Sequence, residues 1–309
     1  MFHRAVYLTG ATASGKTAVG VALAQRINAE VVALDSMTLY RGMDIGTAKP
    51  TLEERGGIAH HLIDVLDPWE SASVAEYRNW ALRSAAEIEG RGRRVLFVGG
   101  TALYLKALLR GLFEGPAAVP ELRLELEVEA DRIGSEGLHA RLAAIDPPTA
   151  ARLHPNDRRR LIRALEVITV TGRPLSELQT EHERVAPAEV AVFALHRPRQ
   201  ELHDRINRRV LAMFEDGFVD EVRRLKDGLR PMGSVPAQGV GYREVLEHLE
   251  TGLPLRETVS LIQARTRQFA KRQETWFRGL AEVKLWSVEA SESPDLIAER
   301  LASRLDGGN

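Results

Sequence analysis

The chain has 309 residues, of which 44% are hydrophobic and 28% are charged, and its formal net charge is −1. This composition is typical of a globular protein with a core large enough for two domains. The absence of cysteine excludes disulfides, thiolate catalysis and cysteine-ligated zinc. No apolar run approaches the ~20 residues of a membrane helix, so we expect a cytoplasmic protein that does not associate with membranes.

Short apolar runs alternate with helical patterns along the chain, which predicts an α/β fold with a mostly parallel sheet flanked by helices. The predicted strands lie at 5–10, 30–35, 61–66, 94–100, 189–196 and 283–288. Between 114 and 189 the pattern is helical, with Pro and Gly breaks and no convincing strand. We therefore predict a catalytic core of residues 1–113 and 190–309 and an inserted all-helical domain at 114–189.

The first predicted strand runs into GATASGKT, residues 10–17, and an Ala- and Val-rich helical pattern follows. This is a P-loop in its strand-loop-helix setting, so the core is predicted to be a P-loop core. Its backbone amides surround a phosphate, Lys16 neutralises phosphate oxygens, and Thr17 offers a hydroxyl to a magnesium ion. The predicted phosphate-binding residues are Gly10, Thr12, Ala13, Ser14, Gly15, Lys16 and Thr17.

A nucleoside triphosphatase also needs an acidic residue at the end of a second strand. The strand predicted at 94–100 ends instead in Gly99 and Gly100, followed by Thr101, which weakens that interpretation. The nearest carboxylate is Asp35, which should face the P-loop because residues beyond the carboxyl ends of parallel strands line the ligand crevice. Its position fits a general base, a magnesium ligand or a helix cap.

Two segments are locally basic. Residues 152–163 hold five arginines against one aspartate, and residues 260–279 hold five Lys or Arg against one glutamate. Such runs are usually solvated helix faces, and contact with nucleic acid is the alternative. The second segment also has an apolar repeat every seven residues, at Ile262, Phe269 and Trp276. This repeat predicts a packing seam, with the two aromatic rings in the core rather than stacked on bases.

Eight segments occur in an informative order: GATASGKT (10–17), DSMTLYRGMDIGTAKP (35–50), HHLIDVLDP (60–68), VGGTALYLKALLRGL (98–112), HPNDRRRLIRALEV (154–167), LHDRINRRV (202–210), GVGYRE (239–244) and TRQFAKRQETWFRG (266–279). Together they resemble the bacterial tRNA dimethylallyltransferases, also called tRNA isopentenyltransferases. The resemblance extends from the P-loop to about Arg278. Ala11 stands where the family often has proline, and Thr38 where glutamine or leucine is more usual.

The resemblance implies transfer of a dimethylallyl group from dimethylallyl diphosphate to the exocyclic amine of the adenine on the 3′ side of the tRNA anticodon, with Mg²⁺ and without consumption of ATP. The P-loop would then hold the diphosphate leaving group. Asp35 would be the catalytic base, Thr101 would help to hold the reacting centre, and Arg209 would contact the diphosphate with Arg205 beside it. The alternative for these two arginines, which share a helix face, is a surface ladder.

The resemblance also implies contacts with the tRNA anticodon stem-loop from Asp35, Ser36, Met37, Thr38, Thr101, Arg123, Arg159, Arg160, Leu161, Ile162, Arg163, Gln238, Gly241, Tyr242, Arg243, Arg267, Lys271 and Arg272. The wider segment 266–273 is included in this prediction. Two other interpretations stay open. One is a small-molecule kinase that uses the helical insertion as a lid, and the other is a non-catalytic tRNA-binding module. We expect a monomer.

Overall fold

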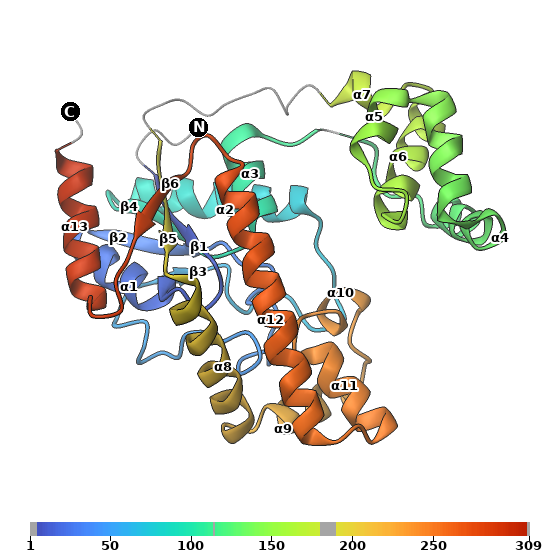
Figure 1. Cartoon of the computed structure of the whole chain (residues 1–309). Helices are drawn as coiled ribbons and strands as arrows, with labels where there is room; N and C mark the ends of the chain where they lie inside the picture. Colours follow the sequence, from blue (N-terminus) through green and yellow to red (C-terminus); the bar gives the residue numbers. More distant parts are fainter. Residues whose placement is uncertain (1–4, 114, 180–189, 308–309) are drawn as a thin grey trace. The chain divides into compact units, whose positions relative to one another are not determined.

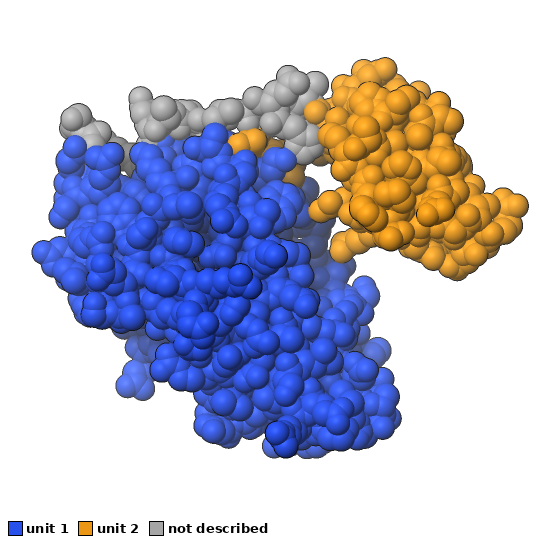
Figure 2. Space-filling view, viewed as in Figure 1, with its two compact units in different colours: residues 1–109, 186–309 blue, residues 110–185 orange. Residues whose placement is uncertain are grey.

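The computed structural model describes residues 5–113, 115–179 and 190–307 (Figure 1). The chain divides into two compact units, one formed by 1–109 with 186–309 and the other by 110–185 (Figure 2). We predicted the ends of the inserted domain at residues 114 and 189, and both positions lie outside the described residues. None of the described helices is both long and apolar enough to cross a membrane.

A six-stranded sheet forms the centre of the larger unit. Its strands are β1 Val6–Gly10, β2 Ala29–Ala33, β3 His60–His61, β4 Arg94–Val98, β5 Ala191–His196 and β6 Lys284–Ser287. The strand order is β3-β2-β4-β1-β5-β6, and every described pairing is parallel. The predicted α/β fold with a parallel sheet is therefore confirmed. All carboxyl ends lie at one edge of the sheet, which is where the P-loop begins.

One predicted strand was largely wrong. Of residues 61–66 only His61 belongs to a strand, in the two-residue β3, and Leu66 makes a single parallel bridge with Tyr40. The backbone leaves the extended conformation because Leu62 and Asp64 have φ of 61° and 57°. Two residues in the left-handed region cannot continue a ladder. The apolar run 61–66 therefore covers the end of the sheet as a loop instead of extending it.

Helices of the larger unit cover both faces of the sheet, and those within residues 218–251 pack against other helices instead. The helices of this unit are α1 Lys16–Arg26, α2 Val74–Gly90, α3 Ala102–Arg110, α8 Arg199–Glu215, α9 Phe218–Lys226, α10 Ser234–Ala237, α11 Tyr242–Thr251, α12 Leu255–Arg278 and α13 Pro294–Asp306. On one face α1 and α13 lie side by side (Figure 1) and pack on Val6 and Leu8 of β1. On the other, Tyr7 stacks on Phe97 among residues from α2, α3 and α12. This alternation follows from the two-residue period of a strand.

A buried carboxylate fixes the loop that follows β2. Glu221 of α9 is 2% exposed and accepts hydrogen bonds from the amides of Asp44, Ile45 and Gly46 at 2.7–3.2 Å. The hydroxyl of Tyr242 donates to the same carboxylate at 2.6 Å. These four bonds satisfy a charge that would otherwise be costly to bury. They hold the segment 36–50 against the C-terminal helices.

The smaller unit consists of α4 Pro120–Ile145, α5 Pro147–Arg152, α6 Arg158–Thr171 and α7 Leu175–Leu178. The helical patterns at 121–133 and 136–145 form one element with a kink at Gly134, whose φ is 75° and ψ 166°. Its core includes Leu138, Leu142 and Leu165. Glu166 is fully buried and accepts hydrogen bonds from the side chains of Arg123 and Arg163 and from the amide of Val119.

Gly99, just after β4, lies against the end of β2. A Cβ at this position would lie 2.1 Å from the carbonyl oxygen of Leu34, which is part of the backbone and cannot move aside cheaply. Any side chain here, including the acidic residue of a nucleoside triphosphatase, would push β2 and β4 apart. Packing between the two strands therefore explains why this position is glycine.

We expect Gly99→Ala to lower the free energy of unfolding by ~1–3 kcal/mol, the usual cost of overpacking. Gly90→Ala is the matched control, because nothing lies within 4 Å of a Cβ there. Since Gly90 ends α2, alanine should be neutral or slightly stabilising at that position. Urea unfolding of both variants measures the difference, and equal stabilities would contradict the close approach at Gly99.

Candidate active site

The P-loop connects β1 to the N-terminus of α1. Gly10 and Gly15 have φ of 143° and 96°, a conformation that residues with a side chain rarely adopt. The Lys16 ammonium donates to the carbonyl oxygen of Ala11 at 2.7 Å and so lies across the loop. Burial lowers the pKa of Lys16 to about 8, and the negative charge of Asp35 opposes this shift. Amides, helix N-terminus and lysine thus converge on one site for an anion.

Side chains from the C-terminal half of the chain hold the P-loop in place. The Gln273 side chain accepts a hydrogen bond from the Thr12 amide and donates one to the carbonyl oxygen of Gly100, each at 2.8 Å. Arg205 and Arg197 donate from Nε to the carbonyl oxygens of Ala13 and Ser14, also at 2.8 Å. Because the two arginines bind carbonyl oxygens on one side of the loop, the amides on its other side stay free to bind an anion. Their guanidinium groups add positive charge beside the loop.

A cationic cavity of about 710 Å³, the outer chamber, lies against the P-loop. Lys16 and Arg205 line it together with Arg208 and Arg209, and Glu54 is the acidic residue on its wall. Thr17, at the start of α1, is exposed and also lines it. This concentration of positive charge at the end of a helix favours a multiply charged anion such as a diphosphate.

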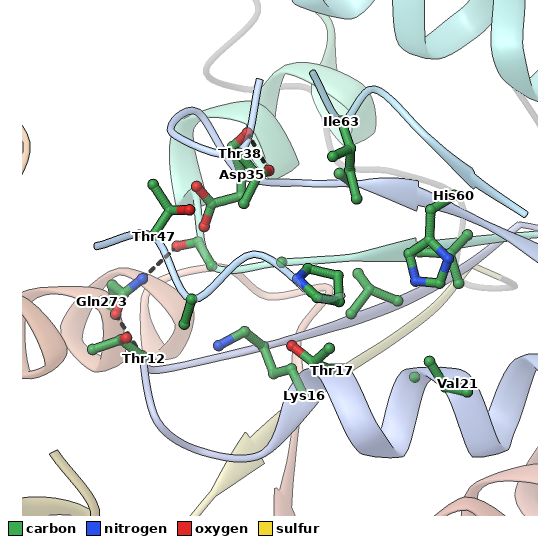
Figure 3. A pocket seen from close by; sticks show the side chains of 18 of the residues that line it. Thr12, Lys16, Thr17, Val21, Asp35, Thr38, Thr47, His60, Ile63 and Gln273 are labelled. Atoms are coloured by element: carbon green, nitrogen blue, oxygen red, sulfur yellow. Dashed lines mark hydrogen bonds between the residues drawn. The ribbon is translucent and has the colours of Figure 1, made fainter. Parts of the chain in front are cut away.

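A smaller cavity of about 120 Å³, the inner chamber, lies between α1 and the ends of β2, β3 and β4. Figure 3 shows Lys16 and Thr17 rising from α1 along its middle, with Asp35, Thr47 and Gln273 toward one end and Val21 and His60 at the other. Its apolar walls are formed by Val21, Val31, Ala33, Pro50, Ile63 and Val98. These walls suit a short hydrocarbon group attached to the anion.

A third cavity of about 350 Å³, the wide chamber, lies on the other side of Asp35. It is lined by Thr12, Asp35, Ser36, Met37, Gly46, Thr47, Thr101, Arg209, Val210, Met213, Phe218, Val235, Gln238, Gly239, Val240, Gly241, Tyr242, Ile262, Thr266, Phe269 and Arg272. Apolar and aromatic side chains alternate here with hydroxyls and amides. A flat heterocycle with polar edges fits such a lining better than a phosphate does.

The three chambers meet at Arg209, which lines all of them, and at Asp35, which lines the inner and wide chambers. Burial lowers the pKa of Arg209, and the charge of Asp35 opposes that shift. One carboxylate oxygen of Asp35 accepts from the Met37 amide at 2.8 Å. No described residue donates a hydrogen bond to the other oxygen, Oδ2.

Comparison with known proteins agrees with this geometry. The sequence model of the IPP transferase family matches residues 38–280. A tRNA dimethylallyltransferase from Geobacter metallireducens is 47% identical over 284 residues, which are 92% of each chain. One from Burkholderia thailandensis is 47% identical over 307 residues, 97% of this chain and 94% of the relative. The chain belongs to the IPP transferase family of tRNA dimethylallyltransferases.

Solved structures give the same answer. The tRNA isopentenylpyrophosphate transferase from Bacillus halodurans has a TM-score of 0.71 and is 40% identical, with 98% of this chain and 97% of that chain covered. A eukaryotic dimethylallyltransferase acting on tRNA has a TM-score of 0.80 at 27% identity, with 98% and 78% covered. Membership of this prenyltransferase family decides against the kinase and the non-catalytic module.

The structure places the residues that resemblance to the tRNA dimethylallyltransferases suggested for catalysis around one junction. Asp35 and Arg209 lie there, and Thr101 joins them in the wide chamber. The Thr101 hydroxyl accepts a hydrogen bond from the Ser36 amide at 3.1 Å, so it fixes the segment that carries Asp35. Arg205 is half-buried and bonded to the P-loop, so a surface ladder no longer describes it.

Several residues suggested for tRNA contact do not line the wide chamber. The side chains of Leu161 and Ile162 belong to the core of the smaller unit, where they stabilise α6. Gln273, at the end of the segment 266–273, is buried at the P-loop. Within the described part of the chain, those that line the wide chamber are Asp35, Ser36, Met37, Thr101, Gln238, Gly241, Tyr242 and Arg272, whereas Thr38 lines the inner chamber.

The remaining basic residues of these segments lie on surfaces. Arg159, Arg160, Arg243 and Lys271 are exposed, and Arg267 is half-buried and donates to Asn207 at 2.6 Å. Arg123 and Arg163 keep partly exposed guanidinium groups although both are bound to Glu166. These arginines therefore have a structural task in the smaller unit, which leaves part of each group free to meet a phosphate.

The packing seam predicted on α12 was wrong for both aromatic residues. Phe269 and Trp276 are 36% and 39% exposed, whereas Ile262 is buried. The buried side of α12 carries Thr258, Ile262, Thr266, Ala270, Gln273 and Phe277, which follow the helical period. A seven-residue repeat drifts around a straight helix, so Phe269 turns toward the inner and wide chambers, with the Arg272 guanidinium 5.8 Å from its ring centroid.

Sequence reasoning missed Arg197 altogether and misread Gln273. Arg197 is 5% exposed, and its guanidinium bonds the Ser14 carbonyl and the Glu201 carboxylate. A single arginine after a strand carries no signal, because nothing in the sequence shows that it folds back onto a loop 183 residues away. Gln273 carries no signal either, because its close approach to Gly100, where a Cβ would lie 2.5 Å from the Gln273 amide, exists only in the folded chain.

We expect Gln273→Glu to weaken the binding of inorganic diphosphate about tenfold or more. The carboxylate cannot donate to the Gly100 carbonyl and adds a negative charge beside the phosphate site, and a lost buried hydrogen bond alone costs ~1–3 kcal/mol. Calorimetric titration measures the affinity. Gln263→Glu is the matched control, because Gln263 also lies on α12 but bonds the carbonyl of Asn207. Equal affinity in the two variants would show that Gln273 does not shape the P-loop.

Proposed function

We propose that this enzyme transfers the dimethylallyl group of dimethylallyl diphosphate to the exocyclic amine of the adenine 3′-adjacent to the tRNA anticodon and releases diphosphate. The observation that carries the proposal is the junction at Arg209 and Asp35. There a cationic chamber, a small apolar chamber and a wide chamber meet. A reaction that brings together a diphosphate, a five-carbon group and a base needs one compartment for each.

The outer chamber suits the leaving group. The allylic carbon–oxygen bond breaks and its electron pair goes to the diphosphate, so negative charge grows on oxygens beside the P-loop. Lys16 and Arg209 face this charge, and Arg205 stands beside the loop carbonyl that it binds. Donors already in position stabilise such charge without reorganising, which is a large source of rate enhancement.

Thr17 is the residue that would hold Mg²⁺. Its hydroxyl lines the outer chamber at the start of α1. The described residues contain no group of three or more His, Cys, Asp or Glu side chains able to form a metal cage. Magnesium commonly takes one or two protein ligands and completes its shell with water and substrate phosphates, so a single hydroxyl beside a diphosphate fits it. The ion would neutralise charge on the leaving group.

The inner chamber suits the dimethylallyl group. A cavity of ~150 Å³ holds a benzene molecule, so about 120 Å³ accommodates a group of about five carbons. The chamber shares Lys16 and Thr17 with the outer chamber and Asp35 with the wide one. The first carbon of the donor can therefore lie between the diphosphate and the incoming amine.

The wide chamber suits the adenine, and Asp35 suits the base. The adenine amine is a poor nucleophile because its lone pair is delocalised into the ring. As nitrogen attacks carbon, its proton must leave, and Oδ2 of Asp35 is the oxygen that can accept it. The Met37 amide holds the other oxygen. The helix-cap interpretation of Asp35 is wrong, because no described helix lies between β2 and α2 and the bond from the Met37 amide closes a turn instead. An anticodon-loop adenine is already unpaired and costs only a few kcal/mol to extrude.

Exposed basic residues of both units suit contact with the phosphates of the anticodon stem-loop. Arg159 and Arg160 lie on the surface of the smaller unit, and Lys271 and Arg272 on that of α12. The enzyme would act as a monomer. It would act in the cytoplasm, where its tRNA substrate is found.

The direct test is incubation of the enzyme with labelled dimethylallyl diphosphate and total tRNA, followed by nucleoside analysis. We expect label on adenosine next to the anticodon, dependence on Mg²⁺ and release of one diphosphate per transfer. Lys16→Ala, which removes a cation from the leaving group, should impair transfer while tRNA still binds. Label that stays in the diphosphate donor with wild-type enzyme would overturn the proposal.

Asp35→Asn keeps the size of the side chain but cannot accept the proton of the amine. We expect single-turnover transfer to fall ~100-fold or more, the usual contribution of a general base, while both substrates bind with near-normal affinity. Rapid-quench measurement with saturating tRNA and metal determines the rate. Rescue by higher metal concentration would indicate a magnesium ligand instead. A normal rate would indicate that Asp35 only holds the turn through its bond from the Met37 amide.

Neutralising Arg159 with Arg160, or Lys271 with Arg272, should weaken tRNA binding. The slope of log affinity against log salt should flatten by roughly one unit per lost phosphate contact. Affinity for dimethylallyl diphosphate should not change. Arg83→Ala, on the exposed side of α2 outside both basic segments, is the control and should keep the wild-type slope. An unaltered slope in the double variants would make these segments solvated helix faces.

A further inference from the structure

The inner chamber has an end opposite Asp35 where no residue has yet been given a task in the proposed chemistry. In Figure 3 His60 and Val21 lie at this end, away from Asp35 and Gln273. His60 belongs to the two-residue strand β3 at the edge of the sheet and is half-buried, whereas its partner in the register, Val31, is buried in the core. The imidazole therefore lines the chamber from an edge strand and is itself partly exposed to solvent.

The orientation of this imidazole is fixed. Its Nδ1 lies 2.9 Å from the carbonyl oxygen of Ile58, so Nδ1 carries the proton and donates it to that oxygen. Burial lowers the pKa of His60, so the ring is neutral near pH 7. A neutral ring held by one hydrogen bond can form an end wall against hydrocarbon. The neighbouring His61 has a different environment, because its Nε2 contacts the buried Glu30 carboxylate at 2.7 Å.

The size of the chamber bears on which donors can bind. About 120 Å³ is close to the space for a five-carbon group, and a ten-carbon chain needs roughly twice that volume. A longer chain with its diphosphate on the P-loop would have to pass the position of His60. The other walls of the chamber are rigid. Val31 and Val98 belong to strands. Gly20 of α1 packs closely on Val98, because a Cβ at Gly20 would lie 2.9 Å from Cγ2 of Val98.

We propose that His60, with Val21 beside it, closes the inner chamber and restricts the allylic donor to five carbons. This rests on the proposed function and adds the residue that sets donor length. The specificity is steric, because a ten-carbon donor has the same diphosphate and the same reacting carbon. Enlarging this end should therefore admit the longer donor without altering the chemistry at Asp35.

The test compares dimethylallyl diphosphate with geranyl diphosphate, the ten-carbon homologue, as donors to tRNA. Wild-type enzyme should use geranyl diphosphate at least ~100-fold less efficiently, judged by kcat/KM. In His60→Ala the ratio of geranyl to dimethylallyl transfer should rise at least ~10-fold, since even one methylene that a pocket rejects is worth ~10–200-fold. Val21→Ala enlarges the same end from α1 and should shift the ratio in the same direction, which keeps a readout if His60→Ala folds poorly.

His61→Ala is the matched control, because it removes an adjacent imidazole that contacts Glu30 and does not line the chamber. Its donor ratio should equal that of the wild type. Gly20→Ala should act in the opposite sense, since the added methyl crowds Val98 and lowers use of dimethylallyl diphosphate without admitting the longer donor.

Two results would overturn this inference: wild-type enzyme that uses both donors equally well, or His60→Ala and Val21→Ala variants that both keep the wild-type ratio. Absence of dimethylallyl transfer by wild-type enzyme would instead overturn the proposed function. In that case the affinities of dimethylallyl and geranyl diphosphate, measured by calorimetry, still test whether the chamber rejects the longer chain, because both compounds carry the same diphosphate. Equal affinities in the wild type would then refute the role of His60 independently.

Discussion

The site depends on how the backbone of the P-loop is held. A phosphate-binding loop works only if its amides point inward, and its carbonyl oxygens must then find donors on the other side. Here those donors are Arg197 and Arg205, and Gln273 accepts from the one amide that turns toward α12. The N-terminal loop therefore takes its shape from residues that follow the inserted helical unit. The proposed phosphate site is therefore complete only in the folded chain, where Arg197, Arg205 and Gln273 are bonded to the loop.

The same constraint brings opposite charges together at the junction of the chambers. In the proposed reaction Lys16 and Arg209 face the departing diphosphate, and the charge of Asp35 favours the protonated form of both. A carboxylate so close to two cations could be consumed in an ion pair. Asp35 is not drawn into such a pair, because the Lys16 ammonium donates to the Ala11 carbonyl and the Asp35 carboxylate accepts from the Met37 amide. Backbone groups therefore hold both side chains in place. In the proposed reaction these backbone bonds keep the base, Asp35, apart from the cation, Lys16, that stabilises the leaving group.

The arginines of the smaller unit differ in what they do for the fold. The middle of α6 is buried, so Leu161 and Ile162 stabilise the smaller unit, while Arg159 and Arg160 in its first turn stay on the surface. Arg123 and Arg163 satisfy the buried Glu166, whose carboxylate would otherwise be an uncompensated charge costing several kcal/mol. A run of arginines in a sequence therefore combines charge that is paired within the fold with charge that stays exposed on the surface.

The sequence by itself determined the parts that local patterns encode. A P-loop is a contiguous motif, and alternating apolar runs sufficed to locate five of the strands because buried parallel strands are continuous in sequence. Asp35, Thr101 and Arg209 could be named from motif resemblance, which reflects an arrangement already selected in relatives. The run at 61–66 failed because positive φ at Leu62 and Asp64 is not visible in an apolar pattern.

Only the tertiary structure decided the contacts that join distant segments. The bonds of Gln273 and Arg197 to the P-loop span 261 and 183 residues, and no local pattern can encode a partner so far away. The direction of Phe269 depended on how α12 packs against α8, and periodicity alone assigned it to the wrong side. The three chambers and the end wall at His60 are likewise properties of packed volume. Side chains from separate elements create that volume, so it exists only once the chain has folded.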